Sequence, residues 1–273
     1  MAKLEVVPKQ PDLWAQLRAA AEDAAREEPR LASQLNAVVL AHDDLAGALS
    51  FQIARKLGDA ELGAMSLREV ALAAFAADPG ILTAAEADLK AVQDRDPAIR
   101  SLLQPFMYFK GFQALQAWRV AHWLWGQGRD TLAFHFQSRI SELFQLDIHP
   151  AARIGSGVFL DHGTGIVIGE TAVVGDEVSM LHAVTLGGTG AERGDRHPKI
   201  GRGVLLGAGA KVLGNIVVGD YAKVASGSVV LKPVPAGCTV AGVPARVVAC
   251  PTDAAPARTM DHTLADIAYD FVI

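Results

Sequence analysis

Aliphatic residues recur at every sixth position through most of the second half of this chain. Six residues are the length of one short strand and one tight turn, in which the aliphatic side chain points inward and glycine tolerates the turn's backbone angles. Three such units close a triangular coil. The repeat occupies thirteen positions, which are Ile148, Ile154, Leu160, Ile168, Val174, Met180, Leu186, Ile200, Leu206, Val212, Val218, Val224 and Val230. Stacked at a strand spacing of ~4.8 Å, these units predict a parallel β-helix of about four coils.

Two interruptions break the six-residue period. We interpret Ile166 and Val167 as a two-residue insertion that is extruded from the coil, and residues 187–199 as a longer, polar, glycine-rich excursion. A regular coil has no use for such an excursion, whereas loops on rigid scaffolds often carry function. The alternative is that 187–199 is a tolerated surface insertion.

The first half of the chain has a different composition. Residues 1–146 hold only 7 of the 26 glycines and are rich in Ala, Leu, Glu and Arg, which favour helices. Helices are expected over 12–27, 31–41, 44–57, 66–77, 81–94 and 105–127, with another before Asp147. The predicted fold class is α+β. It consists of an all-α domain over 1–146, a β-helix over 147–248 with the inserted loop 187–199, and a flexible C-terminal tail over 249–273.

Charge and composition exclude several classes of protein. The net charge of −5 argues against general nucleic-acid binding, which requires a basic surplus. No uncharged apolar stretch reaches ~18 residues, so no membrane span is expected. Residues 1–10 lack the apolar core of a secretory signal. Two cysteines, Cys238 and Cys250, cannot build a disulfide framework and fit a reducing compartment. We therefore expect a cytoplasmic protein.

Several motifs resemble one family of hexapeptide-repeat acyltransferases, the serine O-acetyltransferases. The matching segments are 95–98 (RDPA), 108–114 (YFKGFQA), 147–151 (DIHPA), 160–165 (LDHGTG), 185–190 (TLGGTG) and 195–198 (DRHP). This resemblance covers nearly the whole chain. It implies transfer of an acetyl group from acetyl-coenzyme A to the hydroxyl of L-serine, the first step of cysteine biosynthesis, without a metal. It also implies a left-handed β-helix and a hexamer built from two trimers.

The resemblance assigns the general base to His162. A serine hydroxyl is a poor nucleophile until a base removes its proton, and histidine titrates near ~6.5, which suits that task at neutral pH. Asp147 is expected to hold the other ring nitrogen and to stabilise the imidazolium. The alternative for His162 is a surface residue in a turn. His182 occupies the same place in its repeat unit, so we expect it one coil away from His162, as a neighbour in the acyl or coenzyme groove. The alternative for His182 is a direct catalytic role.

Free serine is a zwitterion, so its site needs both an anion and a cation. Asp96 and Asp161 match the family's ammonium-binding carboxylates. Arg196 and His197, on the inserted loop, match its carboxylate-binding pair, and arginine suits a planar bidentate partner. Asp96 alternatively starts a turn before the proline that follows it, because Asp-Pro is a common turn start.

Coenzyme A needs a slot for its pantetheine arm and positive charge for its phosphates. The small residues Gly188, Ala208 and Ser226 are expected to let the arm approach the coil. Lys232 and Arg246 are candidates for the phosphates, with ordinary solvated side chains as the alternative.

The resemblance also implies an inhibitor and a protein partner. L-cysteine differs from L-serine by one atom, so it is expected to inhibit as the end product. The tail ending in Ile273 is expected to enter the active site of O-acetylserine sulfhydrylase, or alternatively to pack on the protein's own surface.

Three rival functions remain open. The first is acetylation of a sugar or xenobiotic hydroxyl, which would share His162 but would not need Asp96 with Arg196. The second is a zinc hydrolyase on the same β-helix, for which the histidines are too scattered. The third is a scaffold without catalysis, which would not explain Asp147 and His162.

Overall fold

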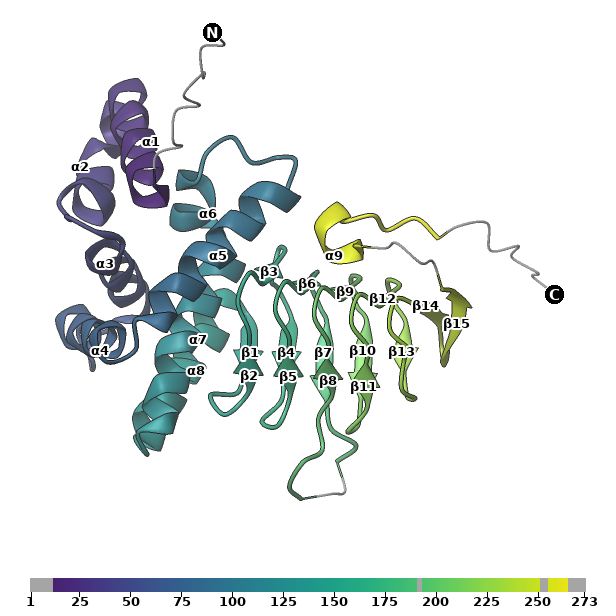
Figure 1. The fold of residues 1–273 in the computed structure, drawn as a ribbon. Helices are drawn as coiled ribbons and strands as arrows, with labels where there is room; N and C mark the ends of the chain where they lie inside the picture. Colours follow the sequence, from purple (N-terminus) through teal and green to yellow (C-terminus); the bar gives the residue numbers. More distant parts are fainter. Residues whose placement is uncertain (1–11, 191–192, 251–254, 265–273) are drawn as a thin grey trace, which may run out of the picture.

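The computed structural model describes residues 12–190, 193–250 and 255–264 of the chain. Figure 1 shows a helical domain and a row of stacked coils that extends away from it. The helical elements are α1 (Leu13–Glu27), η1 (Pro29–Leu31), α2 (Ala32–Leu35), η2 (Asn36–Leu40), α3 (Leu45–Leu57), α4 (Ala64–Ala77), α5 (Gly80–Arg95), α6 (Leu103–Tyr108), α7 (Lys110–Gly126) and α8 (Asp130–Phe144). One hydrophobic core continues from Leu17 on α1 to Val240 in the last coil. The predicted helical domain followed by a β-helix is confirmed.

One predicted helix is in fact two. The sequence indicates a single helix over 105–127, whereas the structure ends α6 and begins α7 around Phe109, which is extended at φ −82° and ψ 111°. This break lays Gly111 directly on the β-helix. A Cβ atom added to Gly111 would lie 2.0 Å from the carbonyl oxygen of Leu160. Only glycine fits, because backbone packs against backbone there.

All thirteen repeat positions lie in strands, one in each of β1–β13. The strands are β1 (Leu146–Ile148), β2 (Arg153–Ile154), β3 (Phe159–Leu160), β4 (Ile166–Ile168), β5 (Val173–Val174), β6 (Ser179–Met180), β7 (Thr185–Gly187), β8 (Lys199–Ile200), β9 (Leu205–Leu206), β10 (Lys211–Leu213), β11 (Val217–Val218), β12 (Lys223–Val224), β13 (Val229–Val230), β14 (Thr239–Gly242) and β15 (Ala245–Ala249). They form three sheets, which we call sheet A (β1-β4-β7-β10-β13), sheet B (β2-β5-β8-β11) and sheet C (β3-β6-β9-β12-β14-β15). Every pairing is parallel except that of β14 with β15.

The β-helix is longer than the repeat alone indicates. Sheet A contains five strands, so the coil makes about five turns rather than about four. The extra turn lies beyond the last repeat position, where Val234 pairs with Val218 and Val240 pairs with Val224. Val234 follows Val230 after four residues instead of six, and Val240 then resumes the six-residue spacing.

The first interruption is not where we placed it. Ile166 is fully buried in β4, and Val167 pairs with Asp147 on one side and Thr185 on the other. The interpretation of Ile166 and Val167 as an extruded insertion is therefore wrong. The corner at 161–165 instead has one residue more than the next corner, 181–184, and β4 begins one residue early at Ile166, which pairs with Leu146 but not with β7. In this corner His162 has a φ of +57° and two glycines also adopt positive φ.

The C-terminal region differs from prediction in two ways. Cys238 and Cys250 are joined by a disulfide, contrary to our expectation of two reduced cysteines. They flank the hairpin of β14 and β15, whose antiparallel pairing brings their neighbours together. Beyond the hairpin, α9 (Pro256–Thr259) folds back onto the coils, and the buried Ala257 accepts a hydrogen bond from the Ser179 hydroxyl at 2.8 Å. Part of the predicted flexible tail is therefore ordered. Ile273 lies outside the described residues.

The described ranges contain neither a single membrane-spanning helix nor a cluster of metal ligands. None of the helices there is by itself long and apolar enough to cross a membrane, although α4 and α5 pass that test together as a pair bent by 100°. No group of three or more His, Cys, Asp or Glu side chains in those ranges is arranged to hold a metal ion.

Candidate active site

The predicted residues fall on two different corners of the triangular coil. We call the turns that lead from sheet C into sheet A the C–A corner, and those that leave sheet A toward sheet B the A–B corner. Leu160, Met180, Leu206 and Val224 are aligned on neighbouring strands. The residues two positions after them are therefore aligned on the C–A corner, and they are His162, His182, Ala208 and Ser226. These four residues form one column, spaced by ~4.8 Å per coil.

His162 stands at the start of this column on an exposed corner. Its side chain is 69% exposed, and its ring lies 5.7 Å from that of His182, as the repeat predicted. The corner is held from the helical side because Lys110, at the start of α7, donates a hydrogen bond to the Thr164 hydroxyl. The imidazole is therefore presented on a fixed support and remains open to a small substrate.

Asp161 and Asp96 face a common space beside His162. Both carboxylates line a pocket of about 610 Å³ whose wall includes Met260 and His262 from the C-terminal segment. Both also line a second pocket of about 480 Å³ together with His162. Burial raises the pKa of Asp161 and the negative charge of Asp96 raises it further, while positive charge on His162 opposes both effects.

Asp96 combines the two roles that the sequence left open. It caps α5 in an extended conformation, and its Oδ1 accepts a hydrogen bond from the backbone N–H of Ala98 at 2.8 Å. The residue therefore starts a turn, as the alternative interpretation had it. It also lines the pocket that contains Asp161.

Asp147 does not contact His162 in this structure. It lies exposed on β1, and its Oδ1 accepts a hydrogen bond from Gln137 on α8 at 2.7 Å. The carboxylate that approaches the His162 ring is that of Asp161, whose Oδ2 lies 3.8 Å from Nε2. The pairing of Asp147 with His162 stays a prediction.

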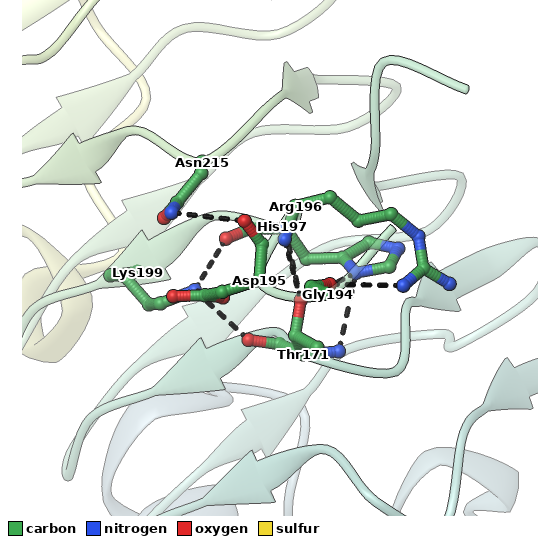
Figure 2. A network of polar contacts seen from close by, with 7 residues as sticks. All are labelled: Thr171, Gly194, Asp195, Arg196, His197, Lys199 and Asn215. Atoms are coloured by element: carbon green, nitrogen blue, oxygen red, sulfur yellow. Dashed lines mark hydrogen bonds and ion pairs between the residues drawn. The ribbon is translucent and has the colours of Figure 1, made fainter. Parts of the chain in front are cut away.

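The inserted loop lies on the A–B corner, tied to the coil beneath it (Figure 2). The Thr171 hydroxyl accepts hydrogen bonds from the backbone N–H groups of Arg196 and His197 at 3.0 and 3.1 Å. Lys199 bridges Asp195 at 2.5 Å and the Thr171 carbonyl at 3.0 Å. The loop is thus fixed on both sides of its Arg-His pair.

The side chains of Arg196 and His197 already have partners within the chain. The Arg196 guanidinium contacts the Glu170 carboxylate at 2.7 Å. His197 is only 7% exposed, and a Cβ atom added to Gly169 would lie 2.0 Å from its ring. Burial lowers the pKa of His197, and the positive charge of Arg196 lowers it further. His197 is therefore held mainly as a neutral imidazole.

The structure does not bring the Arg-His pair to the Asp161 pocket within one chain. Arg196 and His197 follow β7 on the A–B corner, whereas Asp161 and His162 follow β3 on the C–A corner. Gly188 lies beside Arg196, whose Cγ would be 3.2 Å from an added Cβ.

The two predicted phosphate ligands are also separated. Lys232 is exposed after β13 on the A–B corner, and Arg246 is exposed on β15, opposite Ala241.

Sequence reasoning missed two supports of the site. Lys110 and Gly111 fall within a motif quoted only for its resemblance, and nothing in the repeat points to them. A glycine inside a predicted helix lowers its helix propensity, but nothing in the sequence separates Gly111, which packs on the coil, from Gly126, which meets nothing.

Comparison with known proteins decides the family. Residues 13–117 match the family model "Serine acetyltransferase, N-terminal", and residues 197–232 match the bacterial transferase hexapeptide model of six repeats. The serine acetyltransferase of Escherichia coli is 52% identical over 259 residues, covering 95% of each chain. This chain belongs to the serine acetyltransferase family. It is accordingly an acetyl-transferring enzyme with the fold of that family.

Solved structures agree with this assignment. A serine acetyltransferase in complex with cysteine is 50% identical with a TM-score of 0.92, covering 93% of this chain and 98% of that one. The Brucella abortus enzyme in complex with coenzyme A is 53% identical with a TM-score of 0.85, covering 88% and 96%. The similarity thus includes both the helical domain and the coils.

Proposed function

We propose that this enzyme transfers the acetyl group of acetyl-coenzyme A to the hydroxyl of L-serine, giving O-acetyl-L-serine and coenzyme A in the first step of cysteine biosynthesis. The observation that carries this proposal is the arrangement of the C–A corner. An exposed histidine, His162, stands next to two carboxylates at one end of a straight column of corner residues. Membership of the family supplies the reaction, and the corner supplies groups suited to its steps.

The chemistry follows from an exposed imidazole beside a pocket. His162 removes the proton of the serine hydroxyl as the oxygen attacks the thioester carbon directly. The carbon–sulfur bond then breaks, and the imidazolium returns the proton to the coenzyme A thiolate. No covalent enzyme intermediate is needed. Asp147 is proposed to stabilise the imidazolium, which would require its carboxylate to leave Gln137.

The C–A corner and the A–B corner would form one serine site if two neighbouring copies of the chain pack against each other. Asp96 and Asp161 supply the anions for the serine ammonium. The carboxylate of serine needs a cation, and Lys110, which lines the same pocket, already donates to the Thr164 hydroxyl. Arg196 on the A–B corner of a neighbouring copy is proposed to provide the positive charge, with His197 beside it as an uncharged hydrogen-bond donor. In a trimer whose three-fold axis runs parallel to the axis of the β-helix, the C–A corner of each copy would face the A–B corner of the next copy. Such a trimer would contain three serine sites. Two such trimers give the hexamer that we propose.

The same geometry suits coenzyme A. Its pantetheine arm would lie along the column of His182, Ala208 and Ser226, with Gly188 on the facing corner of the neighbouring copy. Lys232 and Arg246, both exposed but on different faces of the coil, are proposed to bind the phosphates of coenzyme A. L-cysteine is proposed to compete with L-serine, because a site that grips the ammonium and carboxylate cannot strongly reject a thiol in place of a hydroxyl. The tail ending in Ile273 is proposed to bind O-acetylserine sulfhydrylase.

A thiol-release assay tests the reaction itself. The purified enzyme is given acetyl-coenzyme A with L-serine, homoserine, a galactoside or no acceptor. We expect acceptor-dependent release of coenzyme A with serine far above the other three. Preference for the galactoside would support the rival sugar acetyltransferase instead.

The role of His162 is tested by substitution. His162→Ala is expected to lower kcat by roughly 10²–10⁴ with little change in folding, because the side chain is exposed. His182→Ala, one coil along the same column, is the matched variant. Its main effect should be on KM for acetyl-coenzyme A. Near-normal turnover in His162→Ala would remove this residue from the role of base.

A further inference from the structure

The last residue of α5, Arg95, is buried against the β-helix. It is 8% exposed. Its Nη1 donates to the Ser179 hydroxyl at 3.0 Å and to the carbonyl oxygen of Glu177 at 3.2 Å. Both acceptors belong to the coil that leads into and forms β6. The end of α5 is therefore attached to one strand of sheet C.

This arginine has no carboxylate partner among the described residues. Arg119, the other buried arginine of the helical domain, forms an ion pair with Asp88 at 2.6 Å. Arg95 instead donates to neutral acceptors. Burial lowers its pKa, and the negative charge of Glu177, which lies beyond ion-pair distance, opposes this only in part. A buried cation without an ion pair is unfavourable. A leucine or methionine would pack α5 against the coil without the cost of burying a charge. We therefore infer that the charge and the directed hydrogen bonds of Arg95 have a role other than packing.

The strand that Arg95 grips also holds Asp161. The backbone N–H of Asp161 donates to the carbonyl oxygen of Met180 at 2.8 Å, and Met180 is the residue after Ser179 in β6. Asp96 directly follows Arg95. Ser179 and Met180 are adjacent in β6, and they bind Arg95 and the backbone of Asp161, respectively. The residue before Asp96 and the backbone of Asp161 are therefore attached to the same short strand.

Two carboxylates in one half-buried pocket repel each other. Without an anchor, the turn that starts at Asp96 would relieve this repulsion by moving away from Asp161, because the residues after it lie in an exposed turn. The hydrogen bonds of Arg95 to β6 oppose that movement. A fixed spacing of two carboxylates is what lets a single ammonium group contact both of them.

We propose that Arg95 is the positioning residue of the serine site: by binding Ser179 of β6 and the carbonyl of Glu177 just before this strand, it holds Asp96 opposite Asp161. The inference rests on the proposed serine acetylation and adds a residue to it. Arg95 does not touch the substrate, and it acts only through the position of Asp96.

The test compares KM values for the two substrates. Arg95→Gln keeps part of the hydrogen bonding but removes the charge and the length of the side chain. We expect KM for L-serine to rise about tenfold, as a loss of roughly 1.4 kcal/mol of binding would give, while KM for acetyl-coenzyme A stays within about twofold. Arg95→Lys, which restores the charge, should recover part of the serine KM.

Two further variants separate positioning from folding. Ser179→Ala deletes one hydroxyl beside Arg95 and should raise KM for serine about threefold, which is smaller than the effect of Arg95→Gln. Arg202→Ala removes an exposed arginine that contacts the Glu177 side chain at 2.6 Å and should leave both KM values unchanged. A purely destabilised enzyme loses active molecules, which lowers kcat and leaves both KM values as they were.

The outcomes are distinct. A serine KM that is unchanged in Arg95→Gln and Ser179→Ala, or that rises together with KM for acetyl-coenzyme A, would overturn the positioning role. If the unsubstituted enzyme does not acetylate serine at all, the proposed function fails first. Should Arg95→Gln not fold, Arg95→Met, which keeps the buried packing and removes the hydrogen bonds, takes its place under the same criterion, because Ser179→Ala also removes the hydrogen bond to the Ala257 carbonyl.

Discussion

Asp88 is the buried charge that joins the helical domain to the coils. It is completely buried on α5. Its Oδ1 accepts the backbone N–H of Val158 at 2.9 Å, just before β3. Its Oδ2 accepts hydrogen bonds from Gln116 at 3.0 Å and from Arg119 at 2.6 and 3.1 Å, both on α7. Two helices and the first coil therefore meet on one carboxylate.

The substitution Asp88→Asn measures how much this charge contributes to the free energy of unfolding. Asparagine has nearly the same volume, so no cavity forms, but Arg119 is left buried at 7% exposure without its counter-ion. Removing one partner of a buried ion pair costs about 3–5 kcal/mol. For a chain of this size each kcal/mol lowers Tm by about 2–4 °C, so we expect a decrease of roughly 6–20 °C.

The assay is thermal and urea unfolding of the purified variants. Asp94→Asn is the matched control, since Asp94 lies on the same helix in an exposed pair with Lys90. It should lose no more than ~1 kcal/mol. The double variant Asp88→Asn with Arg119→Met should recover part of the loss, because the uncompensated charge is gone. A loss below ~1 kcal/mol in Asp88→Asn would refute the idea that this pair joins the two domains.

Two further predictions concern the site. Asp96→Asn removes a charge that raises the pKa of Asp161. Because serine binding needs ionised Asp161, the pH below which KM for serine rises should shift to a lower value. An unshifted acid limb in the profile of KM against pH would count against the carboxylate pair. Gly111→Ala places a Cβ 2.0 Å from the Leu160 carbonyl and should lower both kcat and stability, the latter by ~1–3 kcal/mol in urea unfolding. Gly126→Ala, whose Cβ meets nothing within 4 Å, should be neutral or slightly stabilising, and equal losses in both glycine variants would refute the backbone-contact explanation.

The sequence predicted the coils well because their period reports directly on burial. Each sixth aliphatic residue must face the inside of a narrow coil, so the pattern alone assigns the thirteen strands of the repeat. Where the constraint is weaker, the prediction failed. Beyond Val230, the coil continues through Val234 and Val240, but the step from Val230 to Val234 is only four residues. The period therefore gave a coil that is one turn too short.

Local pattern also misplaced the wide corner. The count of residues shows that two are extra between Leu160 and Ile168, but not which two. The structure keeps Ile166 and Ile168 in β4 because both are buried, and extends the turn at His162 instead. Positive φ at 163 and 165, where the chain has glycine, makes that turn possible. Glycine positions would have decided the question correctly.

Contacts between distant segments were out of reach of the sequence. The break at Phe109 follows from the packing of Gly111 on Leu160, and the hydrogen bond of Ser179 to Ala257 follows from how the chain returns after its last hairpin. Neither has a local signature. The disulfide was easier to predict from the sequence, because Cys238 and Cys250 flank a segment with Gly242 and Pro244, and such a segment is typical of a hairpin.

The division of the site between two corners is already contained in the repeat. Successive units of six visit the three corners in turn, so positions that differ by a whole coil share a corner. His162 and His182 differ by one coil plus the two extra residues, and they do share one. Arg196 follows the strand of Leu186, which belongs to the next unit, and therefore lies on another corner. No rearrangement inside a rigid coil can exchange corners. A serine molecule held by both Asp161 and Arg196 consequently requires a second chain, so the proposed trimer and the proposed substrate site support each other.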